Sequence, residues 1–242
     1  MALVRLQKYF TDCGVMSRRA AEEQIRLGRV YVNDKPAAVG DSVEPGRDVV
    51  EYEGKIIIPM CDEKVYIMLN KPRGYVTTMS DEKGRKNVSM LTSDVCVRVY
   101  PVGRLDMDSD GLLLLTNDGE FAKRLTHPKH DVPKIYHVTV RGKVTPDQLK
   151  TLGSPMTIDG YRIQPVKVTP LHSDDPRKSI LQMTLYEGRN RQIRKMCERA
   201  SLEVSRLTRV AIGDVRLGSL PQGRWRRLTA REIQLLNPQA KG

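Results

Sequence analysis

Carboxylates gather in one short stretch of an otherwise basic chain. Residues 103–119 read GRLDMDSDGLLLLTNDG, so that Asp106, Asp108 and Asp110 stand directly before Gly111 and four leucines. The leucine run is bounded by a glycine and by a turn signal at residues 117–119, and it is short enough for a fully buried strand. The acidic loop should therefore enter the protein core, where a carboxylate must be paired or hydrogen-bonded to stay charged. We expect the chemistry of this chain to lie in this loop.

Two alternatives compete for the same carboxylates. Their spacing matches the start of a calcium-binding loop, but position twelve of such a loop requires a bidentate glutamate, and Asn117 stands there. The leucine run also replaces the flexible half of a calcium loop, so a calcium site is disfavoured. The other alternative is that Asp106 only caps a turn, as Asp108 or Asp110 could. The loop alone does not separate this alternative from a chemical role.

The overall charge indicates a polyanionic partner. The chain has 242 residues and a formal net charge of +12, and residues 187–242 carry 13 Lys and Arg against 5 Asp and Glu, a surplus of +8. The first 35 residues hold seven basic and four acidic side chains, so the N-terminal part is polarised as well. Asymmetric basic faces of this kind are typical of nucleic-acid binding, although charged faces are more often merely solvated.

The same composition disfavours several other classes of protein. No stretch of 18 apolar residues and no signal-peptide pattern occurs, so we expect a soluble, cytoplasmic protein without a membrane partner. The four cysteines form no Cys-x-x-Cys pair and are expected to be reduced. His127 and His130 have no cysteine or further histidine near enough in sequence to complete a zinc set. With no glycine-rich phosphate loop or nucleotide fingerprint either, we expect no metal and no cofactor.

The first 61 residues predict a small module of two helices and a sheet. Leu3, Leu6, Phe10 and Cys13 fall on one helical face, and Ser17 can cap a second helix over residues 18–27 that ends at Gly28. A short strand is expected at 30–32, with further strands within 37–58. A linker near residues 59–63 would separate this domain, residues 1–61, from a second domain, residues 62–242.

The second domain is predicted to be rich in strands. Strands are expected at 65–69, 112–116, 136–141, 161–168 and 180–186, and helices at 120–125 and 146–152. Asn190 can cap a helix that runs to about residue 200, and a capping box at Thr229 and Glu232 opens a last helix. Few helices, and many strands without βαβ alternation, predict an α+β fold with a mixed, mostly antiparallel sheet flanked by helices.

Four separated motifs carry a resemblance that covers nearly the whole chain. They are residues 70–74 (NKPRG), 103–106 (GRLD) with Gly111, 134–136 (KIY) and 188–194 (GRNRQIR). In this order they resemble the RsuA/RluB family of ribosomal RNA pseudouridine synthases. The N-terminal module resembles the S4 RNA-binding domain that precedes the catalytic domain in this family, although helix-turn-helix DNA-binding proteins share its pattern.

The resemblance implies roles for three catalytic residues. Asp106 matches the catalytic aspartate of the family, and Arg194 matches the arginine that contacts this aspartate, keeping it ionised. Tyr136 matches the tyrosine that stacks on the target base and serves in proton transfer. Without the resemblance, Arg194 would be read as an exposed phosphate-binding arginine and Tyr136 as an ordinary aromatic residue of the sheet.

The resemblance also implies an RNA-binding surface. Ile193 would form the apolar floor under the base, and Arg104 would fill the space that the flipped nucleotide leaves or hold its phosphate. Contacts with the RNA are further expected from Lys71, Arg73, Arg191 and Lys195. In the S4 domain we expect RNA contacts from Arg5, Lys8, Arg18, Arg19, Arg26 and Arg29.

The predicted function is the isomerisation of one uridine to pseudouridine in a stem-loop of 23S ribosomal RNA, by a monomer. The lead-in to the aspartate loop and residues 83–86 are most similar to the large-subunit, RluB-like branch of the family. Three alternatives remain: the same reaction on 16S ribosomal RNA, as in the RsuA branch; a non-catalytic ribosome-assembly factor on the same fold; and a helix-turn-helix DNA regulator.

Overall fold

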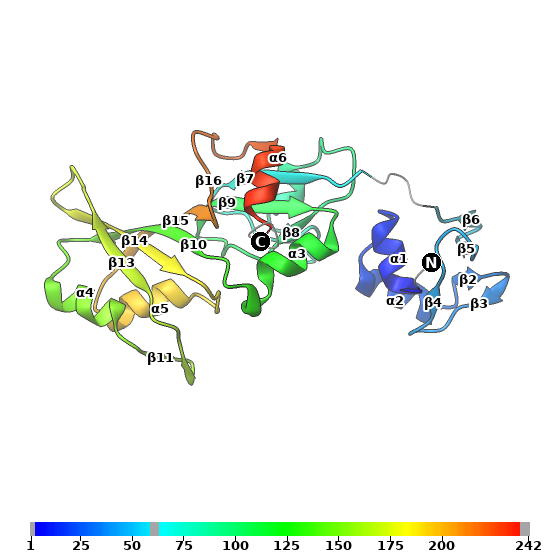
Figure 1. The fold of residues 1–242 in the computed structure, drawn as a ribbon, viewed down its shortest axis with the longest axis horizontal. Helices are drawn as coiled ribbons and strands as arrows, with labels where there is room; N and C mark the ends of the chain where they lie inside the picture. Colours follow the sequence, from blue (N-terminus) through cyan, green and yellow to red (C-terminus); the bar gives the residue numbers. More distant parts are fainter. Residues whose placement is uncertain (1–2, 59–62, 238–242) are drawn as a thin grey trace. The chain divides into compact units, whose positions relative to one another are not determined.

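The computed structural model describes residues 3–58 and 63–237, which divide into two compact units (Figure 1). The N-terminal unit comprises residues 1–64 with 96–98, and the C-terminal unit comprises residues 65–95 and 99–242. The predicted linker at 59–63 lies outside the described residues except for Glu63. No helix in the described part of the chain is long and apolar enough to cross a membrane.

Two short helices and small sheets build the N-terminal unit. Its elements are β1 (Val4–Arg5), α1 (Leu6–Asp12), α2 (Arg18–Arg26), β2 (Val30–Val32), β3 (Lys35–Pro36), β4 (Ser42–Val43), β5 (Val50–Tyr52) and β6 (Lys55–Ile56). The Ser17 side chain caps α2 by accepting a hydrogen bond from the amide of Ala20, as predicted. Leu6 and Phe10 are fully buried, whereas Leu3 precedes α1 and is 72% exposed. The predicted helical face therefore holds from Leu6 onward.

One large sheet forms the framework of the C-terminal unit. Its strands are β7 (Tyr66–Lys71), β8 (Tyr100–Val102), β9 (Asp110–Thr116), β10 (Lys134–Arg141), β13 (Lys167–Leu171), β14 (Lys178–Leu185), β15 (Val204–Ile212), β16 (Val215–Arg216) and β17 (Trp225–Arg227). The strand order is β13-β14-β10-β15-β9-β7-β17, with β16 beside β15 and β8 beside β9. The β9–β15 pair is parallel and the other pairs are antiparallel. The predicted mixed, mostly antiparallel α+β fold is confirmed.

Helices and one hairpin flank this sheet. They are η1 (Val88–Leu91), α3 (Gly119–Thr126), η2 (Pro128–His130), α4 (Pro146–Gly153), α5 (Gln192–Arg199), α6 (Ala230–Leu235) and the hairpin β11 (Thr157–Ile158) with β12 (Tyr161–Arg162). The capping box of Thr229 and Glu232 opens α6, as predicted. The prediction that Asn190 caps α5 is wrong, because the N-cap is Arg191 in the left-handed region at φ 51°. The strand predicted over 161–168 is likewise two separate strands, β12 and β13.

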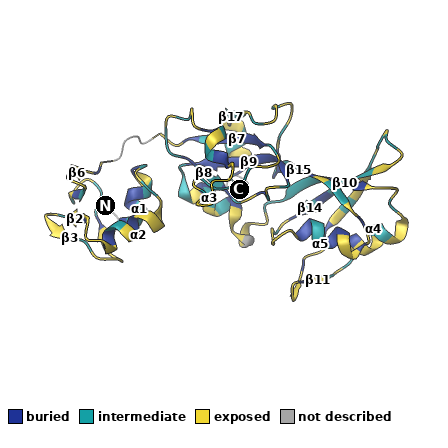
Figure 2. Cartoon of the chain, turned by 180° about the vertical axis from the view of Figure 1, so that it is seen from behind, coloured by how far each residue is buried: buried dark blue, intermediate teal, exposed yellow. Residues whose placement is uncertain are grey.

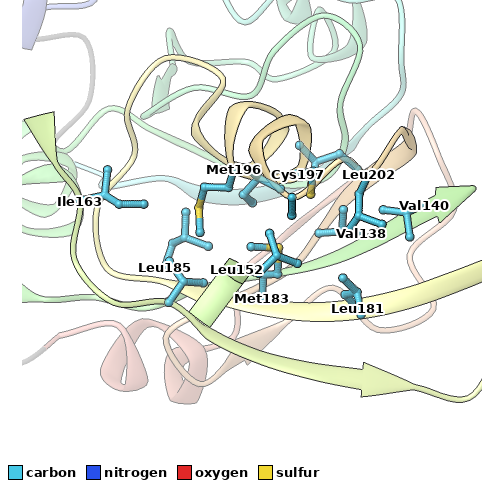
Figure 3. Close-up of a cluster of buried hydrophobic side chains, with 14 of the residues drawn as sticks. Val138, Val140, Leu152, Ile163, Leu181, Met183, Leu185, Met196, Cys197 and Leu202 are labelled. Carbon is cyan, nitrogen blue, oxygen red and sulfur yellow. The ribbon is translucent and has the colours of Figure 1, made fainter. Parts of the chain in front are cut away.

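Buried strands and one face of α5 hold the core of the C-terminal unit together. All seven residues of β9 are buried, so the leucine run is the inner strand that its sequence predicted (Figure 2). On the other half of the sheet, Met196 and Cys197 of α5 pack with Val138 of β10 and Met183 of β14 (Figure 3). This packing holds the start of α5 near the ends of β10 and β14.

Candidate active site

A pocket of about 230 Å³ opens beside the acidic loop. It is lined by Arg104, Leu105, Asp106, Ser109, Tyr136, Leu185, Glu187, Gly188, Arg189, Asn190, Arg191, Gln192, Ile193 and Leu207. Residues from the β8–β9 loop, from β10, β14 and β15, and from the segment that enters α5 therefore meet at one place. Five residues that the sequence singled out line this pocket, namely Arg104, Asp106, Tyr136, Arg191 and Ile193.

Lys71 fixes the main chain of the acidic loop by hydrogen bonds to its carbonyl oxygens. Its side chain is fully buried, and Nζ donates to the carbonyl oxygens of Pro72 (3.1 Å), Asp106 (3.0 Å) and Ser109 (2.8 Å). Burial lowers the pKa of Lys71 to about 8, against the opposing effect of the nearby carboxylates, Asp110 first among them. The prediction that Lys71 contacts RNA is wrong, because a side chain without exposed surface cannot reach a phosphate. Lys71 instead shapes the loop that carries Asp106.

The segment after Lys71 holds the same loop from another side. The hydroxyl of Thr77 donates to the carbonyl of Leu105 (2.6 Å) and accepts from its amide (3.2 Å). The amide of Gly74 donates to the carbonyl of Met107 (2.7 Å). Because the residues on both sides of Asp106 are bonded through their main chain, the direction of its side chain is set before any ligand arrives.

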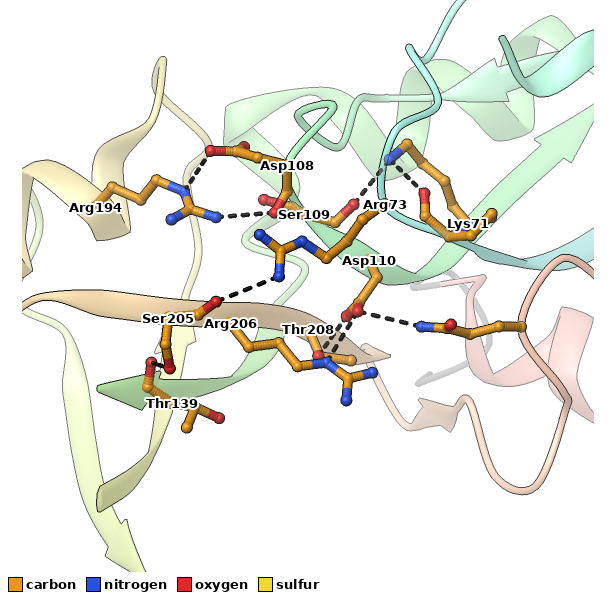
Figure 4. A network of polar contacts seen from close by, with 12 residues as sticks. Lys71, Arg73, Asp108, Ser109, Asp110, Thr139, Arg194, Ser205, Arg206 and Thr208 are labelled. Atoms are coloured by element: carbon orange, nitrogen blue, oxygen red, sulfur yellow. Dashed lines mark hydrogen bonds and ion pairs between the residues drawn. The ribbon is translucent and has the colours of Figure 1, made fainter. Parts of the chain in front are cut away.

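Asp108, not Asp106, is the partner of the arginines from α5. The Asp108 carboxylate lies 2.9 Å from Nη2 of Arg191. It also lies 3.2 Å from Nε of Arg194, which donates to the Asp108 carbonyl as well (2.9 Å) (Figure 4). Burial alone would raise the pKa of Asp108, but the Arg191 hydrogen bond and the Arg194 charge hold it below its usual value. The predicted ion pair between Arg194 and Asp106 is therefore corrected: the residue two positions along the loop takes the guanidinium.

The carboxylate of Asp106 is left free at the pocket. It is half-buried, and it enters none of the side-chain hydrogen bonds or ion pairs found among the described residues. Its charge still acts on the buried cations: it raises the pKa of Lys71 and of Arg194, although burial lowers both pKa values overall. A carboxylate in a cationic field, without a protein partner of its own, is available to a ligand.

A second buried carboxylate, Asp110, joins the two halves of the sheet. It is 1% exposed and accepts hydrogen bonds from Nε of Arg206 (3.0 Å), from Nε2 of Gln222 (3.2 Å) and from the hydroxyl of Thr208 (Figure 4). Two of these donors lie on β15, the strand parallel to β9. The sequence analysis assigned Asp110 no such role, although a carboxylate at the edge of an apolar run must find donors.

Gln192 and Glu187 order the segment that forms the pocket wall, and neither was predicted from the sequence as a residue of the site. Gln192 is 3% exposed, and its side chain donates to Glu187 (3.0 Å) and accepts from the amide of Arg189 (3.1 Å). The sequence signal for this role was the glutamine inside the GRNRQIR motif, but in a basic segment a single glutamine does not stand out from the other polar residues.

Two other predicted RNA contacts lie outside the pocket lining. Arg73 is exposed and donates to the carbonyl of Ser205 (3.3 Å). Lys195 forms an ion pair with Asp159 on the β11–β12 hairpin. Their contacts with RNA stay predictions.

The six basic residues predicted for RNA contact in the N-terminal unit differ in whether their side chains already have a partner in the protein. Arg18 and Arg19 are exposed, and neither has a side-chain partner among the described residues. The other four are engaged: Arg5 with the carbonyl of Gly40, Lys8 with Asp12, Arg26 with Glu23 and Arg29 with Gln24. Arg18 and Arg19 are therefore the most available phosphate ligands of the six.

Possible metal ligands are scattered in the part of the chain that the structure describes. No group of three or more His, Cys, Asp or Glu side chains there could hold a metal ion. Cys13, Cys96 and Cys197 are free thiols, and Cys61 lies outside the described residues.

Comparison with known proteins gives concordant matches. Residues 65–199 match the family model of RNA pseudouridylate synthases, and residues 4–49 match the S4 domain. The chain is 41% identical over 233 residues to the ribosomal large subunit pseudouridine synthase B of Bacillus subtilis (strain 168), covering 96% of this chain and 95% of the relative. It is 39% identical over 231 residues to the dual-specificity RNA pseudouridine synthase RluF of Escherichia coli O157:H7, covering 95% of this chain and 77% of the relative. A crystal structure of a pseudouridylate synthase superposes with a TM-score of 0.67 at 29% identity, covering 97% of this chain and 100% of that one.

Proposed function

Since this chain belongs to the RNA pseudouridylate synthases, with an S4 domain before the catalytic domain, we propose that Asp106 is the catalytic residue with which it isomerises a uridine in 23S ribosomal RNA. The observation that carries the proposal is the Asp106 carboxylate itself. It is half-buried at a pocket lined by Tyr136 and Ile193, its loop is fixed on both sides, and it has no side-chain partner.

The reaction fits a site of this composition. The bond between N1 of uracil and C1′ of ribose breaks, the base rotates, a bond forms between C5 and C1′, and the proton on C5 is replaced by one on N1. Atoms and electrons balance within the nucleotide, so the protein has to bind the base, assist the bond changes and move protons. A carboxylate can assist as a nucleophile or as a base.

The pocket supplies the surfaces that a flipped uracil needs. Ile193, Leu185 and Leu207 offer an apolar floor, and Tyr136 offers a ring that can stack on the base. Arg104 is exposed at the rim, where it can fill the gap in the duplex or hold the phosphate. Through Asp108, Arg191 and Arg194 keep the loop in place and supply positive charge near the reacting sugar.

The choice of 23S over 16S ribosomal RNA rests on similarity. The Bacillus subtilis relative, whose name assigns it to the large subunit, matches along nearly the whole chain. The RluF match, which is named a dual-specificity enzyme, makes a wider target range the second candidate. We further propose that the protein acts as a monomer, and that it does so in the cytoplasm, because the Bacillus subtilis relative is named for the ribosomal large subunit.

The catalytic assignment is tested by the Asp106→Asn variant, in which an amide nitrogen replaces one carboxylate oxygen. Wild-type protein and the Asp106→Asn variant are incubated with 23S and 16S ribosomal RNA from cells that lack the gene, and pseudouridine is mapped by carbodiimide-dependent primer extension. We expect one 23S position to be converted by the wild type and by Asp147→Asn, an exposed aspartate on α4, but not by Asp106→Asn. Conversion by Asp106→Asn would refute the catalytic role. Conversion only in 16S RNA would refute the proposed target but not the reaction.

A further inference from the structure

An exposed aromatic ring stands next to the pocket. Tyr161, on β12, is 57% exposed, and Tyr186 is the other tyrosine of the C-terminal unit that is exposed in the described residues, at 40%. A phenol ring in water loses the favourable burial that aromatic side chains usually obtain. Exposed aromatic rings on proteins that bind single-stranded nucleic acid commonly serve as stacking surfaces.

The hairpin that carries Tyr161 is held rigidly. Asp159 and Gly160 form its turn with positive φ values of 51° and 79°, the combination of a tight two-residue hairpin. The Asp159 side chain forms an ion pair with Lys195 on α5. The hairpin that presents the Tyr161 ring is therefore linked to α5, the helix that also contributes Ile193 to the pocket.

One face of the ring is already covered, and by a residue of the pocket. The guanidinium carbon of Arg189 lies 4.0 Å from the centroid of the Tyr161 ring. Arg189 also lines the pocket that contains Asp106, and its Nε lies 3.5 Å from the carboxylate of Glu187. A single side chain thus touches the ring and lines the pocket.

We propose that Tyr161, backed by Arg189, is a stacking platform for an unpaired base that neighbours the target uridine in the RNA. The proposal rests on the proposed function, because it takes the pocket as the site of the target base. The occupant follows from the chemistry of the platform: a base is flat, apolar on its face and attached to a phosphate that Arg189 and the exposed Arg162 attract. Stacking accepts any base, so the platform positions the loop without reading its sequence.

The test uses stem-loop RNA that contains the converted uridine, with 2-aminopurine replacing each neighbouring loop base in turn. In the full-length wild type, stacking on Tyr161 quenches the fluorescence of 2-aminopurine at one position. We expect Tyr161→Ala to remove this quenching and to raise the Kd about tenfold, as for the loss of one stacked base. The single-turnover rate at saturating RNA should change less than about twofold, since the reacting base is not touched. Tyr161→Phe keeps the ring and should behave as wild type.

Tyr186→Ala is the matched control, an exposed tyrosine of the same unit, and should leave quenching and Kd unchanged. The platform is overturned if Tyr161→Ala binds as tightly as wild type, or if Tyr161→Phe is as weak as Tyr161→Ala, which would assign the effect to the hydroxyl. If the wild type converts no uridine yet quenches through Tyr161, the proposed function fails and the platform stands. If it converts uridine without such quenching, the platform alone fails.

Discussion

Two carboxylates of one loop have opposite environments although they lie two residues apart. Asp108 is held by Arg191 and Arg194, whereas the carboxylate of Asp106 faces the pocket without a side-chain partner. A turn at residues 107–108, closed by a hydrogen bond from the Ser109 amide to the Asp106 carbonyl (3.1 Å), separates the two side chains, so that one meets α5 and the other lines the cavity. The arginines therefore act on Asp106 through the loop and through their charge, and not through a direct ion pair.

This division of roles predicts that Arg194→Lys lowers kcat on RNA by about tenfold or more, because a lysine lacks the planar fork with which Nε faces the Asp108 carboxylate while Nη2 donates to its carbonyl. KM should change little, since Arg194 is mostly covered and does not line the pocket. Steady-state kinetics on the converted stem-loop measure both values. Arg199→Lys, an exposed arginine of the same helix, is the control. A rise in KM at constant kcat would mean that Arg194 binds the RNA directly.

The motifs of the family resemblance predicted which residues meet at the pocket better than they predicted the contacts among them. The convergence of Asp106, Tyr136 and Ile193 follows from the motifs that carry them. The burial of Lys71 was not predicted, because lysine is almost never fully buried unless it has partners, and two of its three carbonyl partners, those of Asp106 and Ser109, belong to a loop whose path only the fold defines.

At the scale of elements, β9 and β15 show what a pattern can and cannot predict. The leucine run predicted β9, because an uninterrupted apolar run fits a strand that is covered on both faces. The nine-residue strand β15 was missed. Its sequence, VSRLTRVAI, places arginines and polar residues in the middle, where they are partly exposed or bonded to β9 residues such as Asp110. Their partners lie nearly one hundred residues away, so no local window contains the reason for the strand.

The close contact between β9 and β15 predicts that Gly111→Ala strongly destabilises the folded protein. At φ +106° a Cβ on residue 111 would lie 2.3 Å from the carbonyl oxygen of Arg209, in the parallel β9–β15 pair. We expect a loss of unfolding free energy of about 3 kcal/mol or more, measured by urea denaturation. Gly142→Ala also has a positive φ but nothing within 4 Å of the added carbon, and should cost about 1 kcal/mol. Equal losses in the two variants would show that the close approach to Arg209 is not what requires glycine.

The ion pair between Arg226 and Glu232 of α6 predicts a pH-dependent contribution to stability. Hydrogen bonds from Arg226 lower the pKa of Glu232 from its ordinary 4.5 to about 2. Because the folded pKa lies below the unfolded one, the stabilisation is fully present above about pH 4.5 and is lost as the pH falls toward 2. Glu232→Gln should therefore be less stable by about 2 kcal/mol at pH 7, with a difference that shrinks between pH 4.5 and 3.

Urea denaturation at several pH values measures this difference. Glu198→Gln, an exposed glutamate on α5, should show no such narrowing. A difference between wild type and Glu232→Gln that stays constant down to pH 3 would mean that the carboxylate is not selectively stabilised in the folded protein.

On the scale of the whole molecule, the proposed function divides the work on RNA between the two units. The C-terminal unit contains the pocket and most of the excess positive charge, and the N-terminal unit presents Arg18 and Arg19 without side-chain partners. Two modules on one chain that contact the same RNA increase the effective concentration of each for its own site. Under the proposed function, the chain binds RNA through phosphates on both units, while the pocket takes the target base.

This division predicts that Arg18→Gln with Arg19→Gln weakens binding without affecting the chemistry. Removing two phosphate ligands should raise KM about tenfold near physiological salt and reduce the slope of log Kd against log salt by about 2, while kcat stays unchanged. Arg47→Gln with Lys55→Gln removes two charges from the same unit outside the predicted RNA-binding set, and it should change the salt slope by less. A fall in kcat with an unchanged slope would show that the N-terminal unit shapes the reacting site. Since Arg18 and Arg19 begin a helix capped by Ser17, and their side chains are not used in its packing, stability should be the same in all of these variants.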